Sequence, residues 1–171
     1  MEATATVYKG LRFRSKLAAR WAVFFDELRE SFEYERETIQ LSADLYCAPD
    51  FWLPRQAIWI ETQLDVERAV GLHQVTDKSV YIFEGFPDVK RFSDDLGQAE
   101  YVAEICNFEI YAVTRNAPNE CLSLTGMRLN NTMLYILGMM DQNMSKETFR
   151  LRTALLSIAA LKGKNSTFDA F

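Results

Sequence analysis

Residues 57–63 read AIWIETQ, and this short run of β-favouring residues decides the fold. Side chains alternate between the two faces of a strand, so one face carries Trp59, Glu61 and Gln63, and the other carries Ile58, Ile60 and Thr62. The predicted strand therefore places the carboxylate of Glu61 among core-like neighbours.

Helical and extended segments surround this run. Residues 15–29 form the clearest helix, because Leu17, Trp21 and Leu28 recur at helical spacing and Ser15 can cap it. Further helices are expected over 64–74, 129–140 and 146–161, the last ending near Gly163, and strands over 38–41, 80–83 and 109–114. Residues 49–54 are bracketed by prolines and read as extended, and 88–107 permit a helix after the Pro87 turn.

This order of elements predicts an α/β (α+β) layered fold, in which a mixed sheet is flanked by helices. The helix over 15–29 is expected to pack on a sheet that contains residues 57–63 and 80–83. The chain has 171 residues and shows no linker or internal repeat. It is therefore expected to form one domain over 1–171, with a helical C-terminal portion at about 127–162.

Composition excludes several classes of protein. Hydrophobic residues make up 49% and charged residues 25%, which is globular rather than disordered. No apolar stretch is long enough to span a bilayer and the first ten residues lack the pattern of a signal peptide, so we expect a cytoplasmic protein with no membrane partner. The three cysteines, Cys47, Cys106 and Cys121, are expected to be reduced thiols.

Charge is unevenly distributed along the chain. The net charge of −5 argues against a broad basic face for nucleic acid. Residues 9–20 nevertheless carry five basic side chains and no acidic one, whereas residues 26–37 carry six acids against two bases. The basic segment could meet a phosphate or an acidic partner, or be the solvated face of a helix and its entry loop.

The only histidine, His73, lies in a predicted helix with no acid placed to orient it, which favours a surface or capping role over catalysis. The Gly-rich phosphate-binding, HExxH, GxSxG and EF-hand patterns are all absent. The chemistry of the chain must therefore be sought elsewhere.

A pair of carboxylates is the stronger signal. If Asp50 begins one strand of a hairpin and Glu61 lies in the next, the two carboxylates converge at one end of the sheet, beside the backbone carbonyl of Thr62. Mg²⁺ or Mn²⁺ is bound by such oxygens, and the ion then polarises a phosphoryl group and supplies a metal-bound hydroxide. The structural alternative is a turn at Asp50 and an edge position for Glu61.

Four segments carry a resemblance to a known family: residues 8–28 read YKGLRFRSKLAARWAVFFDEL, 32–35 read FEYE, 49–54 read PDFWLP and 59–63 read WIETQ. Together they resemble the PD-(D/E)XK nuclease-like superfamily, common in phages, plasmids and bacteria. The resemblance is close over 8–63 and weaker through 80–87. It implies a restriction-endonuclease-like core and metal-dependent phosphodiester cleavage, with Asp50, Glu61 and Gln63 at the catalytic positions.

Two positions depart from the family pattern. The glutamate that the family carries on its first helix aligns with Ala18, and the lysine of its motif aligns with Gln63. The first change removes a metal contact and leaves Ser15 with half of a capping box. The second removes the cation that stabilises or deprotonates the attacking water, although some restriction enzymes of the superfamily use Gln or Glu there.

Three functions follow as hypotheses. The chain engages DNA with residual Mg²⁺ chemistry at Asp50, Glu61 and Thr62 and with phosphate steering by Arg12, Arg14, Lys16 and Arg20. Alternatively, it is a catalytically dead nuclease scaffold that binds a host or phage protein, for instance as a phage inhibitor of a host defence system. A structural or assembly role in a mobile element is the third.

Overall fold

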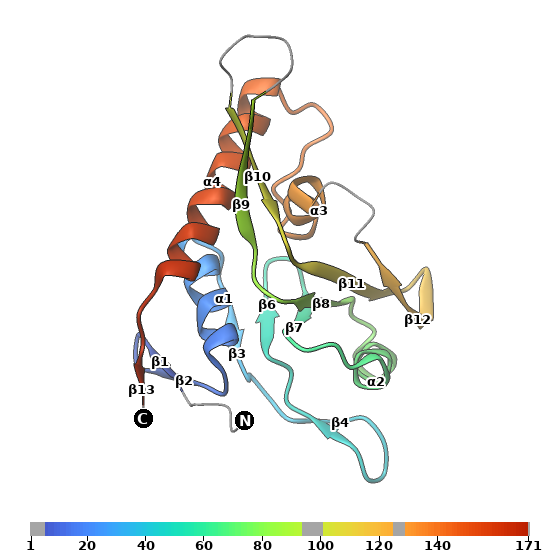
Figure 1. The fold of residues 1–171 in the computed structure, drawn as a ribbon. Helices are drawn as coiled ribbons and strands as arrows, with labels where there is room; N and C mark the ends of the chain where they lie inside the picture. Colours follow the sequence, from blue (N-terminus) through green and yellow to red (C-terminus); the bar gives the residue numbers. More distant parts are fainter. Residues whose placement is uncertain (1–5, 94–100, 125–128, 171) are drawn as a thin grey trace. The chain divides into compact units, whose positions relative to one another are not determined.

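The computed structural model describes residues 6–93, 101–124 and 129–170 of the chain (Figure 1). The chain divides into two compact units, each built from segments that are distant in sequence. The first unit contains residues 1–30, 86–107 and 127–171, and the second contains 31–85 and 108–126. It remains a prediction that residues 1–171 form a single domain. The packing of the 15–29 helix on the sheet is also still a prediction.

A six-stranded mixed sheet forms the second unit, as the order of elements predicts. Its strand order is β12-β11-β8-β7-β6-β3, and only β7 and β8 pair in parallel. The strands are β3 (Glu33–Tyr34), β6 (Phe51–Leu53), β7 (Ile58–Glu61), β8 (Val80–Glu84), β11 (Glu109–Thr114) and β12 (Ala117–Ser123). A small separate ladder joins β4 (Ile39–Gln40) to β5 (Tyr46–Cys47). This confirms the four predicted strands, with small shifts at their ends: those over 38–41, 57–63, 80–83 and 109–114.

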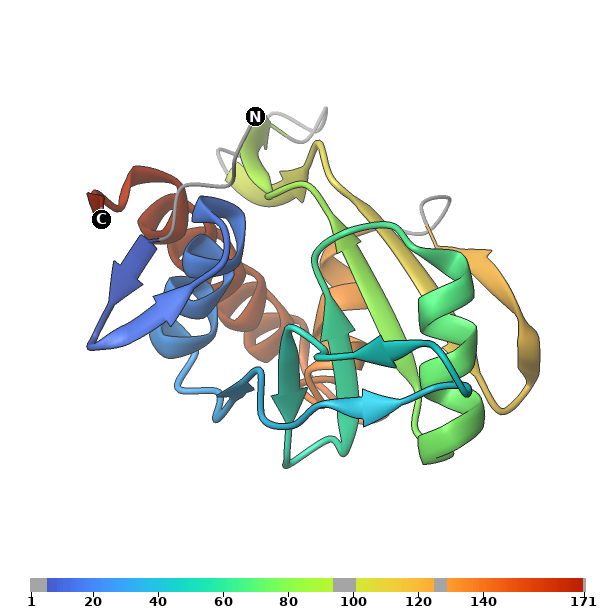
Figure 2. The same ribbon diagram turned by 90° about the horizontal axis from the view of Figure 1, so that it is seen from below.

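Helix α2 (Val66–Thr76) makes the crossover between the two parallel strands. Parallel neighbours require a connection of this kind, because a tight turn cannot return the chain in the same direction. The helix lies against the strands in Figure 2, and its buried Leu72 shares a core with Trp52 and Trp59. These two tryptophans stand opposite each other in the β6–β7 register, with ring centroids 4.5 Å apart. The face of β7 that carries Trp59 and Glu61 is therefore the face that α2 covers.

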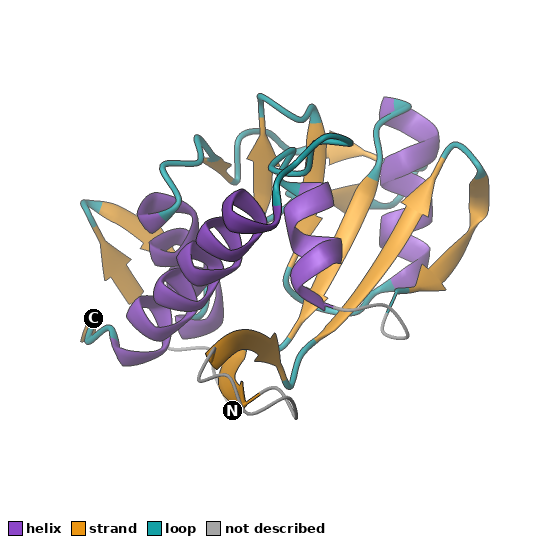
Figure 3. Cartoon of the chain, turned by 90° about the horizontal axis from the view of Figure 1, so that it is seen from above, coloured by secondary structure: helices purple, strands orange, loops and turns teal. Residues whose placement is uncertain are grey.

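Helices dominate the first unit. These are α1 (Lys16–Glu27), α3 (Leu129–Ile136) and α4 (Lys146–Asn165), and Figure 3 shows α1 and α4 running side by side. Ser15 caps α1 by accepting a hydrogen bond from the Ala18 N–H at 3.0 Å, as predicted. Trp21 is fully buried among the rings of Phe24, Phe25 and Phe86.

Strands at the two ends of the chain meet in the same unit. A three-stranded sheet has the order β13-β1-β2, formed by β1 (Thr6–Tyr8), β2 (Leu11–Phe13) and β13 (Asp169–Ala170). Residues 88–107 contain an antiparallel pair, β9 (Asp88–Ser93) with β10 (Tyr101–Cys106), so the helix that this segment permits is wrong for its described part. Its valines and aromatic residues favour strands, and mutual pairing satisfies the backbone groups of both.

Two glycines correct the predicted ends of the C-terminal helices. Gly138 adopts a left-handed φ of 64° and ends α3 at Ile136, because the Met139 N–H bonds back to the Leu134 carbonyl in a Schellman motif. Gly163 does the opposite of what was expected, since α4 continues through it to Asn165. No helix within the described ranges is long and apolar enough to cross a membrane.

Gly163 is needed where α4 approaches α1 closely, and this generates a stability prediction. A Cβ at Gly163 would lie 2.4 Å from Cζ of Phe86 and 2.8 Å from the backbone oxygen of Arg20. We expect Gly163→Ala to lower the free energy of unfolding by about 1–3 kcal/mol, measured by chemical denaturation, because the clash outweighs the better helix propensity of alanine.

Gly71→Ala in α2 is the matched control. Its Cβ would meet only the flexible Leu41 side chain, at 3.3 Å. We expect a change within about 1 kcal/mol of zero, since alanine gains helix propensity and Leu41 can adjust. Equal losses at the two glycines would contradict the close-approach role of Gly163.

Candidate functional site

Asp50 and Glu61 are paired across two neighbouring antiparallel strands of the second unit. Phe51, the first residue of β6, is the register partner of Ile60 of β7. Asp50 directly precedes β6, so the continuation of this register places it opposite Glu61. Directly opposite residues of an antiparallel pair project to the same face. Both are buried, with exposed fractions of 6% for Asp50 and 4% for Glu61.

Thr62 holds the carboxylate of Asp50. The Thr62 N–H donates to Oδ2 of Asp50 at 2.8 Å, and the Thr62 hydroxyl donates to the same oxygen at 2.7 Å. These two hydrogen bonds help to satisfy one oxygen of a carboxylate that is shielded from water. Asp50 thereby holds Thr62, the residue that follows β7, in place. This cross-strand contact goes beyond the local turn at Asp50 that the sequence offered as the structural alternative.

Arg68 covers the carboxylate of Glu61. Its Nε donates to Oε1 at 3.1 Å and its Nη2 donates to Oε2 at 3.4 Å, so both carboxylate oxygens face the guanidinium. Nη2 also donates to the backbone carbonyl of Ala48 at 2.7 Å. Cys47 completes the cluster, with its Sγ 2.9 Å from Nε of Arg68 and 3.5 Å from Oε1 of Glu61.

The start of α2 explains why Arg68 reaches Glu61. Asp65 caps the helix by accepting a hydrogen bond from the Arg68 N–H at 3.0 Å, which starts α2 only a few residues after β7 ends. The first turn of the helix is then held close to the end of the strand that it follows. A helix N-terminus also favours negative charge nearby. The buried carboxylate of Glu61 is therefore favoured both by the guanidinium of Arg68 and by the N-terminal end of α2.

Burial governs the protonation of this cluster. Desolvation, followed by the nearby Asp50 charge, raises the pKa of Glu61 from 4.5 to about 7, although Arg68 pulls the pKa down. Desolvation and Glu61 raise the pKa of the Cys47 thiol to about 12. The thiol is therefore neutral at physiological pH and serves as a weak donor to Glu61 rather than as a nucleophile.

The donor set does not fit Mg²⁺ or Mn²⁺ in this arrangement. Both oxygens of Glu61 are engaged by Arg68, and one oxygen of Asp50 is engaged by Thr62. A divalent cation at Glu61 would meet the positive charge of the guanidinium, and hard cations need free oxygen ligands. Among the residues that the structure describes, no group of three or more His, Cys, Asp or Glu side chains could hold a metal ion.

The other predicted site residues are spread over the two units. Gln63 follows Thr62 in the second unit and is exposed. Ala18 is buried in α1 of the first unit, which also contains the candidate phosphate-steering residues. Of these, the exposed ones are Arg12 on β2, Arg14 after it and Lys16 at the start of α1, whereas Arg20 on α1 is partly buried. Their roles toward nucleic acid stay predictions.

His73 has a structural role near the end of α2. It is buried, and its Nδ1 lies 2.7 Å from the backbone carbonyl of Lys78, just beyond the helix. Of the two roles expected from the sequence, the surface role is wrong because the ring is buried, and the hydrogen bond just beyond the helix end agrees with the capping role.

Sequence reasoning missed two members of the cluster, Arg68 and Cys47. Arg68 lies in a predicted helix, where an arginine is usually a solvated surface residue. The one available signal was its position in the first turn after a strand that ends in a carboxylate. Cys47 gave no signal beyond its place shortly before Pro49 and Asp50.

Comparison of the chain with protein-family models, with curated proteins and with solved structures finds no significant match in any of the three.

The raised pKa of Glu61 generates a pH prediction. The folded state binds a proton at Glu61 more tightly than the unfolded state, so this residue's contribution is complete below pH 4.5 and is lost as pH rises through about 7. We expect the free energy of unfolding, relative to that of Glu61→Gln, to fall between these pH values by up to roughly 3 kcal/mol. Chemical denaturation at several pH values measures it.

Asp77→Asn is the control for that series. The hydrogen bond from Arg115 lowers the pKa of Asp77 below 3.8, so its titration lies outside the window in which Glu61 titrates. We expect wild type and Asp77→Asn to keep parallel stability curves between pH 4.5 and 7. A wild-type curve that also runs parallel to that of Glu61→Gln would contradict the shift.

Proposed function

We propose that this chain is a nuclease-like scaffold that acts as a protein-binding regulator and does not cleave DNA by a metal-dependent reaction. An inhibitor of a host defence system, carried by a phage or another mobile element, is the form of regulator that fits best. The contact between Arg68 and both oxygens of Glu61 carries this proposal. It provides a built-in positive charge at a carboxylate that a nuclease would offer to a metal ion.

Three further observations support the proposal. The resemblance over residues 8–63 lacks the helix glutamate at Ala18 and the motif lysine at Gln63, which both serve cleavage. The net charge of −5 disfavours binding to a polyanion. The Cys47 thiol and the Ala48 carbonyl also bond Arg68, so the guanidinium is held at several points rather than by Glu61 alone.

Slow metal-dependent cleavage of DNA is the second candidate function, and the register of Asp50 opposite Glu61 favours it. On this hypothesis the two carboxylates hold Mg²⁺ once Arg68 moves away, and the basic residues of the first unit steer phosphate. It predicts that Ala18→Glu combined with Gln63→Lys raises the rate of cleavage, because both missing groups are restored.

Metal titration separates the two functions. We expect wild type to show no saturable Mn²⁺ binding by isothermal titration calorimetry and no nicking of supercoiled plasmid. Arg68→Gln should gain saturable Mn²⁺ binding in the same titration, because it frees Glu61 and removes a positive charge. Arg68→Lys keeps the charge and is the matched control, which should resemble wild type.

The opposite pattern would overturn the proposal. Stoichiometric Mn²⁺ binding and plasmid cleavage by wild type, both lost in Asp50→Asn, would establish the enzyme. Circular dichroism of each variant verifies that the fold is kept. A regulator, in contrast, should retain binding to its protein partner in Asp50→Asn and Glu61→Gln.

A further inference from the structure

Two exposed stretches of the second unit, residues 42–46 and 63–67, meet at the contact between Glu61 and Arg68. The first stretch leads directly into Cys47 and the second leads directly into Arg68. Sγ of Cys47 lies 2.9 Å from Nε of Arg68. The C-terminal ends of the two stretches are therefore separated by little more than the length of one arginine side chain.

The hairpin that contains the first stretch is fixed against α2. The Leu41 N–H donates to the Leu45 carbonyl at 2.8 Å, which closes the tip of the hairpin. The side chain of Leu41 lies 3.3 Å from the place that a Cβ on Gly71 of α2 would take, and Ile39 and Leu41 pack on the core that α2 covers. Figure 2 shows the hairpin beside this helix. The two stretches therefore belong to one packed part of the second unit.

The two stretches expose large apolar side chains beside the carboxylate cluster. We name residues 44–46 and 64–67 the cluster rim. Its large apolar side chains are 38–59% exposed, and they are Leu45, Tyr46, Leu64 and Val66. Exposed apolar side chains that gather in one place favour a protein partner, and tyrosine is among the residues that most often carry the binding energy of a protein interface. Tyr46, the most exposed of the four, is therefore the expected anchor.

The charge of the cluster rim indicates the chemistry of its partner. The rim carries Asp44, Asp65 and Glu67 and no lysine, arginine or histidine. Within the ranges that the structure describes, these three carboxylates form no ion pair. Arg68, which directly follows the rim, already pairs with Glu61. The rim therefore attracts a basic partner, whereas it repels nucleic acid, an anionic bilayer and the same acidic rim of a second copy.

We propose that the cluster rim is a docking site for a basic amphipathic segment of a partner protein. The apolar side chains of that segment cover those of the rim, and its lysines or arginines face the three carboxylates. The contact between Cys47 and Arg68 holds the two halves of the rim together, so the buried cluster positions the surface that binds. This inference rests on the proposed function, because it names the surface and the partner chemistry of the regulator.

Two synthetic peptides test the docking site. One is a helical peptide with leucines and one tryptophan on a single face and lysines beside them, and its twin carries glutamate at each lysine position. Fluorescence anisotropy at low ionic strength should show at least tenfold tighter binding of the lysine peptide to the intact chain. Tyr46→Ala with Leu64→Ala should weaken that binding at least tenfold, because it removes apolar contact area from both halves of the rim.

Two further variants separate the rim from general effects of mutation. Tyr135→Ala removes a tyrosine that is 71% exposed on α3 of the first unit, and it should leave peptide binding unchanged. Asp44→Lys with Glu67→Lys should reverse the preference, so that the glutamate peptide binds more tightly than the lysine peptide. Such a reversal would not arise from a loss of folding.

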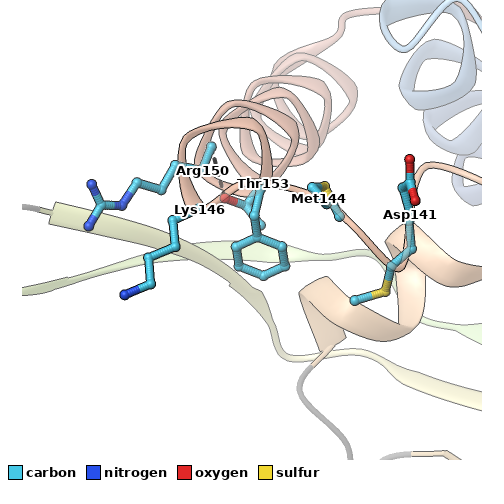
Figure 4. A pocket seen from close by; sticks show the side chains of 7 residues that line it. Asp141, Met144, Lys146, Arg150 and Thr153 are labelled. Carbon is cyan, nitrogen blue, oxygen red and sulfur yellow. Dashed lines mark hydrogen bonds between the residues drawn. The ribbon is translucent and has the colours of Figure 1, made fainter.

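The first unit offers a control for charge. A pocket of about 400 Å³ opens near the beginning of α4, and Figure 4 shows Lys146 and Arg150 on one side of it. Lys146→Glu should leave the affinity for the lysine peptide unchanged, because the rim lies in the other unit. At least tenfold tighter binding of the lysine peptide to this variant would place the peptide at the pocket and overturn the docking site.

Several other outcomes would also contradict the docking site. These are binding of neither peptide, equal binding of both, and unchanged affinity in Tyr46→Ala with Leu64→Ala. Binding of a DNA duplex that the same variant abolishes would assign the surface to nucleic acid. A dimer in sedimentation that dissociates in the same variant would assign it to a second copy.

The two proposals can fail separately. Binding of neither peptide, together with the absence of metal-dependent cleavage, would overturn the docking site and leave the regulator intact. Metal-dependent cleavage by wild type would overturn the regulator and leave the peptide result unchanged.

Discussion

The contact between Arg68 and Glu61 constrains the whole second unit. Glu61 ends β7 in a place that water does not reach, and a buried carboxylate is stable only with donors around it. The first turn of α2 supplies them, which fixes where the crossover between the parallel strands β7 and β8 begins. Removing one partner of such a buried pair typically costs about 3–5 kcal/mol. The same guanidinium bonds the Ala48 carbonyl, so the loop before β6 is tied to the same point.

This constraint also bears on what the chain can do. A carboxylate pair at adjacent strand ends can hold a metal ion only if its oxygens are free, and here Arg68 and Thr62 already donate to them. In the function that we propose, the pair stabilises the fold where a nuclease would use it for chemistry.

The helices and strands follow from the local sequence wherever the local preference of a segment agrees with its packing in the folded chain. Ser15 caps α1 and Trp21 lies on its buried face, because capping and helical spacing depend on residues within a few positions of each other. The β9–β10 pair joins residues only 8 to 18 positions apart, and the sequence does not single it out because the apolar residues of 88–107 also fit helical spacing. By sequence Gly163 is a helix-ending residue, yet its missing Cβ lets α4 run on past the backbone of α1 and the ring of Phe86.

The carboxylate pair and its strands follow from local features of the sequence. The prolines around residues 49–54 and the β-favouring run at 57–63 are local, and antiparallel pairing of two such strands brings Asp50 opposite Glu61. What surrounds that pair depends on packing between elements. The partners of Glu61 come from Cys47, 14 residues before it, and from Arg68, 7 residues after it. Burial of the Trp59 face beneath α2 brings them there and excludes water, and no periodicity or spacing in the sequence specifies that packing.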